Sequence, residues 1–271
     1  MINLGVQERV ALLTGGNQGI GAATAFALAV QGVKVFITYK RLEPLAHAAY
    51  PDAYDRDRAD TAEGVVARIR QAGGVASAAE ADLADPETPG RLFDLAEQAL
   101  GPVEILVNNA SGWLADTFAP READDLGRPL RQVDAASHDH QFAVDTRAPA
   151  LLIAEFARRH LKRGSTWGRI VGLTSEGRNG FPGEVSYGAA KSAQESYTIS
   201  AARELGKYGI TANMVHPPVT DTGWIKKEDE PMLRGLSPLD HIARPEDVAD
   251  VVAFLVSEQA RCVTAQVIKM S

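Results

Sequence analysis

The chain has 271 residues, of which 45% are hydrophobic and 23% charged, a composition typical of a globular protein with a substantial core. Its formal net charge is −7, and no stretch gathers Lys and Arg into the basic face that nucleic-acid binding requires. The single cysteine, Cys262, excludes an internal disulfide, no thiol or carboxylate joins His138 and His140 in a metal-site pattern, and no apolar run approaches the ~18 residues of a membrane span.

Short β-rich runs alternate with longer helical patterns along the chain. Residues 1–7 lack the charged-then-apolar pattern of a signal peptide, so we expect a cytoplasmic protein. The predicted strands are Val10–Leu13, Val33–Tyr39, Val75–Ala79, Ile105–Asn108, Arg169–Leu173, Thr211–Val215 and Gln266–Met270. The predicted helices are Ile20–Gln31, Thr61–Ala72, Thr88–Leu100, Gln141–Lys162, Val185–Lys207 and Pro245–Ser257. This alternation predicts one α/β domain over residues 1–271, a doubly wound Rossmann fold with a seven-stranded parallel sheet.

Two segments interrupt the alternation. Lys40–Asp60 contains two prolines and the charged run from Asp55 to Arg58, so we expect an inserted surface loop whose charges are solvated and pair with one another. Ser111–Ala136 directly follows a predicted strand and is punctuated by glycine and proline. Because ligands bind beyond the carboxyl ends of parallel strands, this second segment is expected to border the ligand crevice.

A glycine-rich turn connects the first predicted strand to the helix Ile20–Gln31. Backbone N–H groups at a helix N-terminus can bind a pyrophosphate, and glycine leaves room for the phosphates to approach closely. The strand before the turn and the helix after it are the context that such a site requires. We therefore predict a dinucleotide-binding turn whose cofactor contacts are Gly15, Asn17, Gln18, Gly19, Ile20 and Gly21.

A phenol and an ammonium lie four residues apart in the predicted helix Val185–Lys207. At this spacing the side chains of Tyr187 and Lys191 project from the same helix face. A phenol titrates near ~10, so it is a weak general acid–base at neutral pH unless a nearby cation favours its ionised form. The same spacing is common by chance and also occurs on solvated helix surfaces. The distance of the pair from the glycine turn and the upstream Ser175 favour a catalytic site for proton transfer.

The glycine turn and the Tyr187-x-x-x-Lys191 pattern together resemble the classical short-chain dehydrogenase/reductase family. The turn has that family's spacing Thr-Gly-x-x-x-Gly-x-Gly, and the likeness extends from about Val6 to Met270. It implies an enzyme, an NAD(P)(H)-dependent oxidoreductase of the carbonyl reductase or alcohol dehydrogenase type that acts on a small carbonyl or alcohol. The activity it most resembles is 3-oxoacyl-carrier-protein reductase, and such relatives are usually homodimers or homotetramers.

The resemblance assigns a role to each catalytic candidate. Ser175, after the strand Arg169–Leu173, orients the substrate oxygen, with the adjacent Thr174 as the alternative hydroxyl. Tyr187 gives a proton to that oxygen while a hydride reaches the carbonyl carbon. Lys191 holds the nicotinamide ribose and lowers the pKa of the tyrosine.

Residues after the second strand bear on the choice of nicotinamide cofactor. The family's acidic position, which hydrogen-bonds the adenosine ribose, falls on Tyr39, and Lys40 and Arg41 follow it. Two cations without a carboxylate favour the 2′-phosphate, and hence NADPH over NADH, unless they simply begin an exposed loop. The resemblance places further cofactor contacts at Asp82, Leu83, Asn109, Ala110, Pro217, Val219 and Thr222.

Several positions depart from the family pattern. Asp145 stands where members usually have an asparagine that holds a water beside the lysine, and an ionised aspartate only accepts hydrogen bonds. Pro218 replaces a glycine and removes an N–H near the expected nicotinamide. The end of the chain also lacks the family's usual Asp-Gly-Gly segment. These departures leave open a second interpretation, a non-catalytic NADP(H)-binding sensor or scaffold.

Three aromatic residues follow strand ends or lie in loops: Trp113, Phe181 and Trp224. They form either an apolar substrate pocket or part of the core, and the sequence leaves both possibilities open. A sugar-nucleotide epimerase of the extended family is disfavoured by the glycine spacing and by the lack of a sizeable C-terminal substrate domain.

Overall fold

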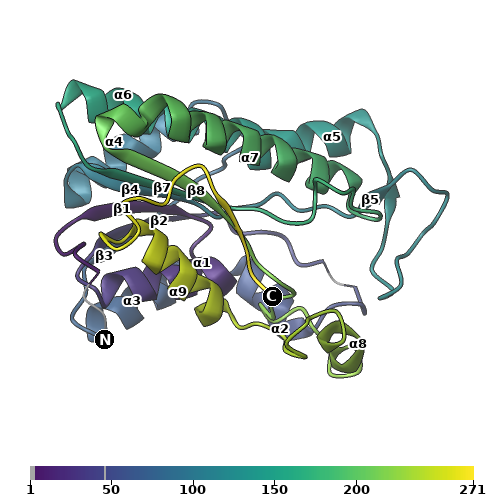
Figure 1. Cartoon of the computed structure of the whole chain (residues 1–271). Helices are drawn as coiled ribbons and strands as arrows, with labels where there is room; N and C mark the ends of the chain where they lie inside the picture. Colours follow the sequence, from purple (N-terminus) through teal and green to yellow (C-terminus); the bar gives the residue numbers. More distant parts are fainter. Residues whose placement is uncertain (1–3, 46) are drawn as a thin grey trace.

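The computed structural model describes residues 4–45 and 47–271. A parallel sheet of seven strands forms its centre, in the order β3-β2-β1-β4-β7-β8-β9 (Figure 1). These strands are β1 (Val10–Thr14), β2 (Lys34–Tyr39), β3 (Ala76–Glu80), β4 (Val103–Asn108), β7 (Gly168–Leu173), β8 (Ile210–His216) and β9 (Val267–Lys269). The chain moves outward from β1 to β3, crosses back to β4 and continues to β9, which confirms the predicted doubly wound fold.

Helices cover both faces of the sheet (Figure 1). One layer holds α1 (Gly19–Ala29), α3 (Glu63–Gln71) and α9 (Pro245–Val256), and the other holds α4 (Thr88–Leu100), α6 (Ala148–Lys162) and α7 (Val185–Leu205). Within residues 4–45 and 47–271, no helix is both long and apolar enough to cross a membrane.

The strand β1 shows why the sheet has a core on each side. All five of its residues are buried. Successive side chains point to opposite faces of a strand, so Ala11 and Leu13 pack into one core while Val10 and Leu12 pack into the other. A strand covered on both faces needs apolar residues at every position, which explains its continuous apolar sequence.

The inserted segment Lys40–Asp60 differs from the expected solvated loop, because it contains the helix α2 (Asp52–Ala59). Pro51 precedes this helix, acidic residues lie in its first turn and basic residues in its last, which suits the helix dipole. Asp55 and Arg58 do pair, at 3.8 Å, but their side chains are only 15% and 12% exposed. This pair is largely covered, whereas Arg56 and Asp57 are exposed. The expected pairing and exposure are thus present in part, and the prediction of a loop was wrong because the run is helical.

The segment Ser111–Ala136 contains two short paired strands, β5 (Asp116–Thr117) and β6 (Arg131–Gln132), and Figure 1 shows β5 beyond one end of the main sheet. The next helix, α5 (Ala135–Phe142), begins six residues before the predicted start at Gln141. Its first turn is stabilised by a capping box between Asp134 and Ser137. The turn has no apolar stripe, so the spacing of apolar residues in the sequence does not show that this part is helical.

The predicted helix Gln141–Lys162 is also interrupted. Residues Ala143–Arg147 form a π-helical turn between α5 and α6. Such turns change the direction in which side chains project, and here the turn carries the buried Asp145. The remaining helical segments are a 3₁₀ turn at Gly206–Tyr208 and the short helix α8 (Glu230–Arg234).

Candidate functional site

The turn after β1 is a glycine cradle at the N-terminus of α1. Gly15 has a φ of 70°, and a Cβ atom on Gly21 would lie 2.0 Å from the Gly15 carbonyl oxygen. Gln18 is the N-cap residue of α1, yet its side chain does not cap the helix, and its buried Oε1 has no hydrogen-bond partner among the described residues. First-turn N–H groups that no cap satisfies fit a phosphate group, as the sequence predicts.

Two other segments border this turn. The Asn109 side-chain amide donates to the carbonyl oxygens of Thr14 (2.9 Å) and Gly15 (2.8 Å), and the Thr14 hydroxyl accepts from the backbone N–H of Ala110 (3.1 Å). The Thr222 side chain lies against Gly19, since a Cβ atom there would be 3.0 Å from its methyl group. The turn, the end of β4 and the loop after β8 therefore meet at one place.

The loop after β8 begins with Pro217 and keeps a defined path despite the proline at 218. The carbonyl oxygen of Pro218 accepts from the Thr220 hydroxyl at 2.9 Å, and that of Val219 accepts from the Ala243 N–H at 3.0 Å. The missing N–H of Pro218 thus leaves the loop anchored through its carbonyl oxygens.

Both cations after β2 are paired with carboxylates. Lys40 Nζ lies 2.7 Å from Asp82 Oδ2, and the Arg41 guanidinium lies 2.9 Å from Glu80 Oε2. The hydrogen bond to Glu80 raises the pKa of Arg41, and the same bond lowers the pKa of Glu80. The sequence interpretation missed Glu80, although the parallel register that pairs Tyr39 with this residue is the signal that would have located it.

The remaining predicted contacts flank these groups. Leu83, next to Asp82, is buried in the core between the sheet and α4. The Asn17 side-chain amide donates to the carbonyl oxygen of Asp60 at 3.1 Å, so the inserted segment reaches the glycine turn. Ile20 packs against the other core.

A buried ion pair lies beside the end of β7. Lys191 Nζ is 2.9 Å from Asp145 Oδ1, and their side chains are 2% and 0% exposed. The other oxygen of Asp145 accepts from the Gly112 N–H at 2.8 Å and from the Gln141 side-chain amide. Lys191 also donates to the Leu173 carbonyl oxygen at 3.1 Å. Both charges are therefore compensated and hydrogen-bonded.

The environment of Tyr187 raises the pKa of its phenol well above the ordinary value. Burial is the largest cause, the negative charges of Asp145 and Glu184 add to it, and a hydrogen bond with Ser175 opposes it. The sequence predicts that Lys191 lowers this pKa, but Asp145 neutralises the ammonium, whose Nζ is 5.7 Å from the phenol ring centroid. The phenol is accordingly protonated at neutral pH.

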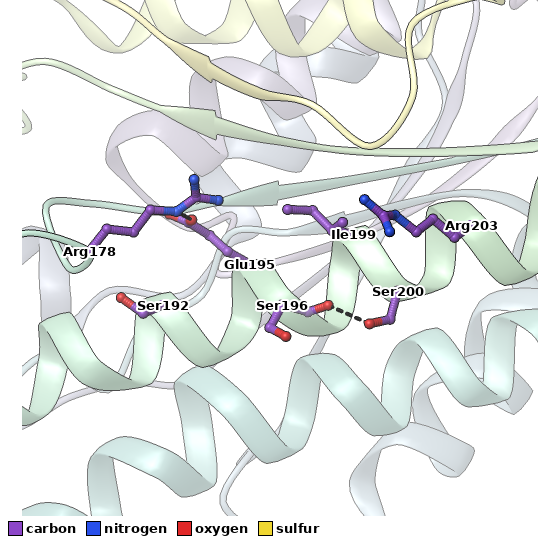
Figure 2. Close-up of a pocket in the computed structure, with 7 residues that line it drawn as sticks. All are labelled: Arg178, Ser192, Glu195, Ser196, Ile199, Ser200 and Arg203. Atoms are coloured by element: carbon purple, nitrogen blue, oxygen red, sulfur yellow. Dashed lines mark hydrogen bonds and ion pairs between the residues drawn. The ribbon is translucent and has the colours of Figure 1, made fainter.

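The two hydroxyls after β7 have different partners. The Thr174 hydroxyl donates to the buried Glu195 carboxylate at 2.7 Å, whereas Ser175 is the residue hydrogen-bonded to Tyr187. Glu195 also binds Arg178 at a surface hollow of about 390 Å³, and Figure 2 shows the hollow's lining side chains along α7. Neither Tyr187 nor Lys191 lines this hollow.

Glu184 connects the start of α7 to the segment after β4. Its two carboxylate oxygens accept from the Trp113 indole N–H at 2.8 Å and from the Arg128 guanidinium at 2.9 Å. The guanidinium carbon lies 5.4 Å from the Trp113 ring centroid and 5.7 Å from that of Trp224. Sequence reasoning singled out both tryptophans but missed Glu184 and Arg128, because ordinary charged residues carry no motif.

Comparison with known proteins gives consistent matches over the chain. A family model described as "Enoyl-(Acyl carrier protein) reductase" matches residues 15–271. The "Uncharacterized oxidoreductase YjdA" of Bacillus subtilis (strain 168) is 34% identical over 265 residues, covering 97% of this chain and 95% of the relative. A "3-oxoacyl-[acyl-carrier-protein] reductase" of Synechocystis sp. is 32% identical over 254 residues, covering 93% and 90%.

A solved structure agrees with these relatives. It is a short chain dehydrogenase from Burkholderia cenocepacia J2315 in complex with NADP, which superimposes with a TM-score of 0.79 at 32% identity. The match covers 98% of this chain and 97% of that one.

The buried ion pair generates a prediction about stability. Asp145→Leu should lower the free energy of unfolding by about 3 kcal/mol, because it leaves the Lys191 ammonium buried without its counter-charge. Urea unfolding followed by circular dichroism measures this change.

The matched controls separate charge burial from a general loss of packing. The double variant Asp145→Leu/Lys191→Met should recover at least about half of the lost stability, since it removes both charges. Asp94→Asn, at a carboxylate that is 73% exposed, should have little effect. A double variant no more stable than Asp145→Leu would contradict the electrostatic explanation.

Proposed function

Because this chain belongs to the short-chain dehydrogenase/reductase family of oxidoreductases, we propose that it reduces a ketone or aldehyde with NADPH, and that Tyr187 is the general acid. The observation that carries this proposal is the phenol of Tyr187, kept protonated by burial and two carboxylates and hydrogen-bonded to Ser175. A protonated phenol in the free site is ready to give a proton, which favours the reductive direction.

The substrate oxygen accepts hydrogen bonds from the Ser175 hydroxyl and from the Tyr187 phenol. NADPH, when bound in the glycine cradle, would supply a hydride to the carbonyl carbon. As the carbonyl π bond breaks, its electrons move to oxygen, and Tyr187 transfers its proton there to complete the alcohol. Asp145 offsets most of the influence of the Lys191 ammonium, and what remains of it favours the resulting phenolate. The lost proton returns through the Lys191–Asp145 pair and water.

The glycine cradle and the cations after β2 support the choice of cofactor. First-turn N–H groups of α1 would hold the pyrophosphate. Asn109, Ala110 and Thr222 lie beside the glycine turn and would contact the nicotinamide half of the cofactor. Lys40 and Arg41 would hold the 2′-phosphate, and the solved relative from Burkholderia was crystallised with NADP. Lys40 is paired with Asp82, and Arg41 is paired with Glu80. The 2′-phosphate therefore has to displace these carboxylates in order to bind the two cations.

The first prediction from the proposed function concerns cofactor selectivity. Wild-type protein should bind NADPH at least about tenfold more tightly than NADH, because the 2′-phosphate gains two charge-assisted contacts. Glu80→Gln should strengthen NADPH binding by up to about fivefold, since it frees Arg41, and should leave NADH binding unchanged.

Fluorescence titration of both cofactors measures these affinities. Glu8→Gln is a matched control, because Glu8 also pairs with an exposed cation, Lys34, but lies before β1. Equal affinities of the wild-type protein for NADPH and NADH would refute the assignment of Lys40 and Arg41.

The second prediction tests the proton donor. Tyr187→Phe should lower kcat by roughly 10²–10⁴-fold and leave NADPH affinity nearly unchanged, because the phenol is lost while the glycine cradle is intact. Tyr197→Phe, a half-exposed tyrosine on the same helix, is the control and should retain full activity. Steady-state NADPH oxidation with a carbonyl panel provides the measurement, and near-normal turnover of Tyr187→Phe would exclude the residue from the mechanism.

The third prediction concerns Asp145 and pH. The Asp145 charge raises the pKa of Tyr187, so Asp145→Asn should lower that pKa. Alcohol oxidation requires the ionised phenol, and its onset should therefore move to lower pH in the variant, while reduction should begin to decline at lower pH.

The pH dependence of kcat/KM for wild type and Asp145→Asn on one alcohol checks this shift. The apparent value belongs to the coupled site rather than to Tyr187 alone. Asp139→Asn, at an exposed carboxylate of the neighbouring helix α5, is the control. Superimposable profiles of wild type and Asp145→Asn would leave Asp145 only a water-holding role.

A further inference from the structure

Four aromatic side chains from three separate segments converge around Arg128. Arg128 contacts Trp113 and Trp224, as described above. The ring centroid of Tyr50 lies 6.4 Å from that of Trp113, and Tyr50 is stacked on Tyr54 with 5.9 Å between the ring centroids. The two apolar cores beside the sheet are built from other residues. These four side chains are named the aromatic wall: Tyr50, Tyr54, Trp113 and Trp224.

The aromatic wall borders the reaction centre. Glu184, which accepts from the Trp113 indole N–H, is the N-cap residue of α7 and lies three residues before Tyr187. Gly112, next to Trp113, donates its N–H to Asp145, the carboxylate paired with Lys191. The Phe181 ring centroid lies 6.0 Å from that of Tyr187. Half of the wall comes from the inserted segment, because Tyr50 precedes α2 and Tyr54 lies in its first turn. Tyr54 also faces Gly223 after β8.

Each cation around the wall is bound by at least one carboxylate. Arg128 binds the Glu184 carboxylate at 2.9 Å and the Asp124 carboxylate at 2.6 Å. Arg58, whose guanidinium carbon is 5.6 Å from the Tyr54 ring centroid, is paired with Asp55. The wall's own phenols are neutral, since burial raises the pKa of Tyr50 to about 12 and that of Tyr54 above its ordinary value.

This balance has a consequence for a charged substrate. An incoming carboxylate would find the Arg128 guanidinium already bound by two carboxylates, and Lys191 already bound by Asp145. It would meet repulsion from these acidic groups and lose its hydration without gaining a free cation. A flat, uncharged ring has no such cost, and it gains edge-to-face or offset contacts with the wall.

We propose that the aromatic wall selects the substrate, and that Glu184 and Asp124 leave Arg128 no free positive charge for an anion, so that the preferred substrate is an uncharged aromatic aldehyde or ketone. This inference rests on the proposed carbonyl reduction. It assigns Glu184 and Arg128 a role in positioning the wall rather than in the chemistry itself.

Wild-type protein and NADPH test the proposal directly with four aldehydes. Benzaldehyde should have a kcat/KM at least about tenfold higher than cyclohexanecarbaldehyde, which has a similar size but no aromatic ring. Methyl 4-formylbenzoate should exceed 4-formylbenzoate by at least about tenfold, because these two compounds differ chiefly in charge.

Two variants test the assigned residues through ratios of substrates. Glu184→Gln still accepts from Trp113 but leaves Arg128 paired with Asp124 alone, so one of the two carboxylates that repel an anionic substrate is lost. The kcat/KM ratio of 4-formylbenzoate to its methyl ester should therefore rise at least about fivefold. A general structural defect, or a changed Tyr187 proton donor, would affect both compounds alike and leave the ratio unchanged. Glu97→Gln is the control. Glu97 lies on α4 and binds Arg159 and Arg163, so loss of its charge should not alter the ratio of the two substrates.

Tyr54→Leu should reduce the preference for benzaldehyde over cyclohexanecarbaldehyde at least about threefold, mainly through the KM of benzaldehyde. Tyr197→Leu, at an exposed position on α7, is its control.

The outcomes separate the two proposals. Turnover with 4-formylbenzoate equal to or faster than its ester, or with cyclohexanecarbaldehyde equal to or faster than benzaldehyde, overturns the wall proposal and leaves carbonyl reduction standing. An unchanged charge ratio in Glu184→Gln overturns the role of the ion pair. Absence of NADPH oxidation with these aldehydes and with a broad ketone panel overturns both proposals and favours the non-catalytic sensor.

Discussion

The buried contact between Asp145 and Lys191 holds the centre of the site together. It joins the π-helical turn before α6 to α7, and its hydrogen bonds extend to the end of β7 and to the chain after β4. Leaving either charge unpaired in this position would lower the free energy of unfolding by roughly 3–5 kcal/mol. The π-helical turn and α7 are therefore held together, because each carries the charge that compensates the other. The contact therefore both joins these segments and sets the charges beside Tyr187.

The same pair decides the state of Tyr187. A lysine four residues from a tyrosine would by itself favour the phenolate, but the neighbouring carboxylate cancels most of that influence. Glu184 adds a second negative charge near the phenol. The site thus starts from a neutral phenol, and a cofactor that brings positive charge when oxidised would shift the balance toward the phenolate needed for the reverse reaction.

The surroundings of Tyr187 illustrate how a common fold acquires a particular pocket. The parallel sheet brings the ends of β1, β4, β7 and β8 to one edge, and this edge carries the glycine cradle and the catalytic candidates. Other groups near Tyr187 come instead from connecting segments, including the chain that holds Arg128 and Trp113. Connections vary without disturbing the sheet, so they are where selectivity is expected to reside.

The sequence by itself determined the seven strands, the glycine cradle and the spacing of Tyr187 and Lys191, because strand burial, turn geometry and helix periodicity are local properties of the chain. It did not determine that Glu80 pairs with Arg41, that Asp145 neutralises Lys191, or that Tyr54 reaches the site. Those contacts join segments from about 40 to over 130 residues apart, and only the packing of the folded chain brings their charges within a few ångströms. Electrostatic interactions depend on distance and burial rather than on residue type, which is why the tertiary structure alone decided them.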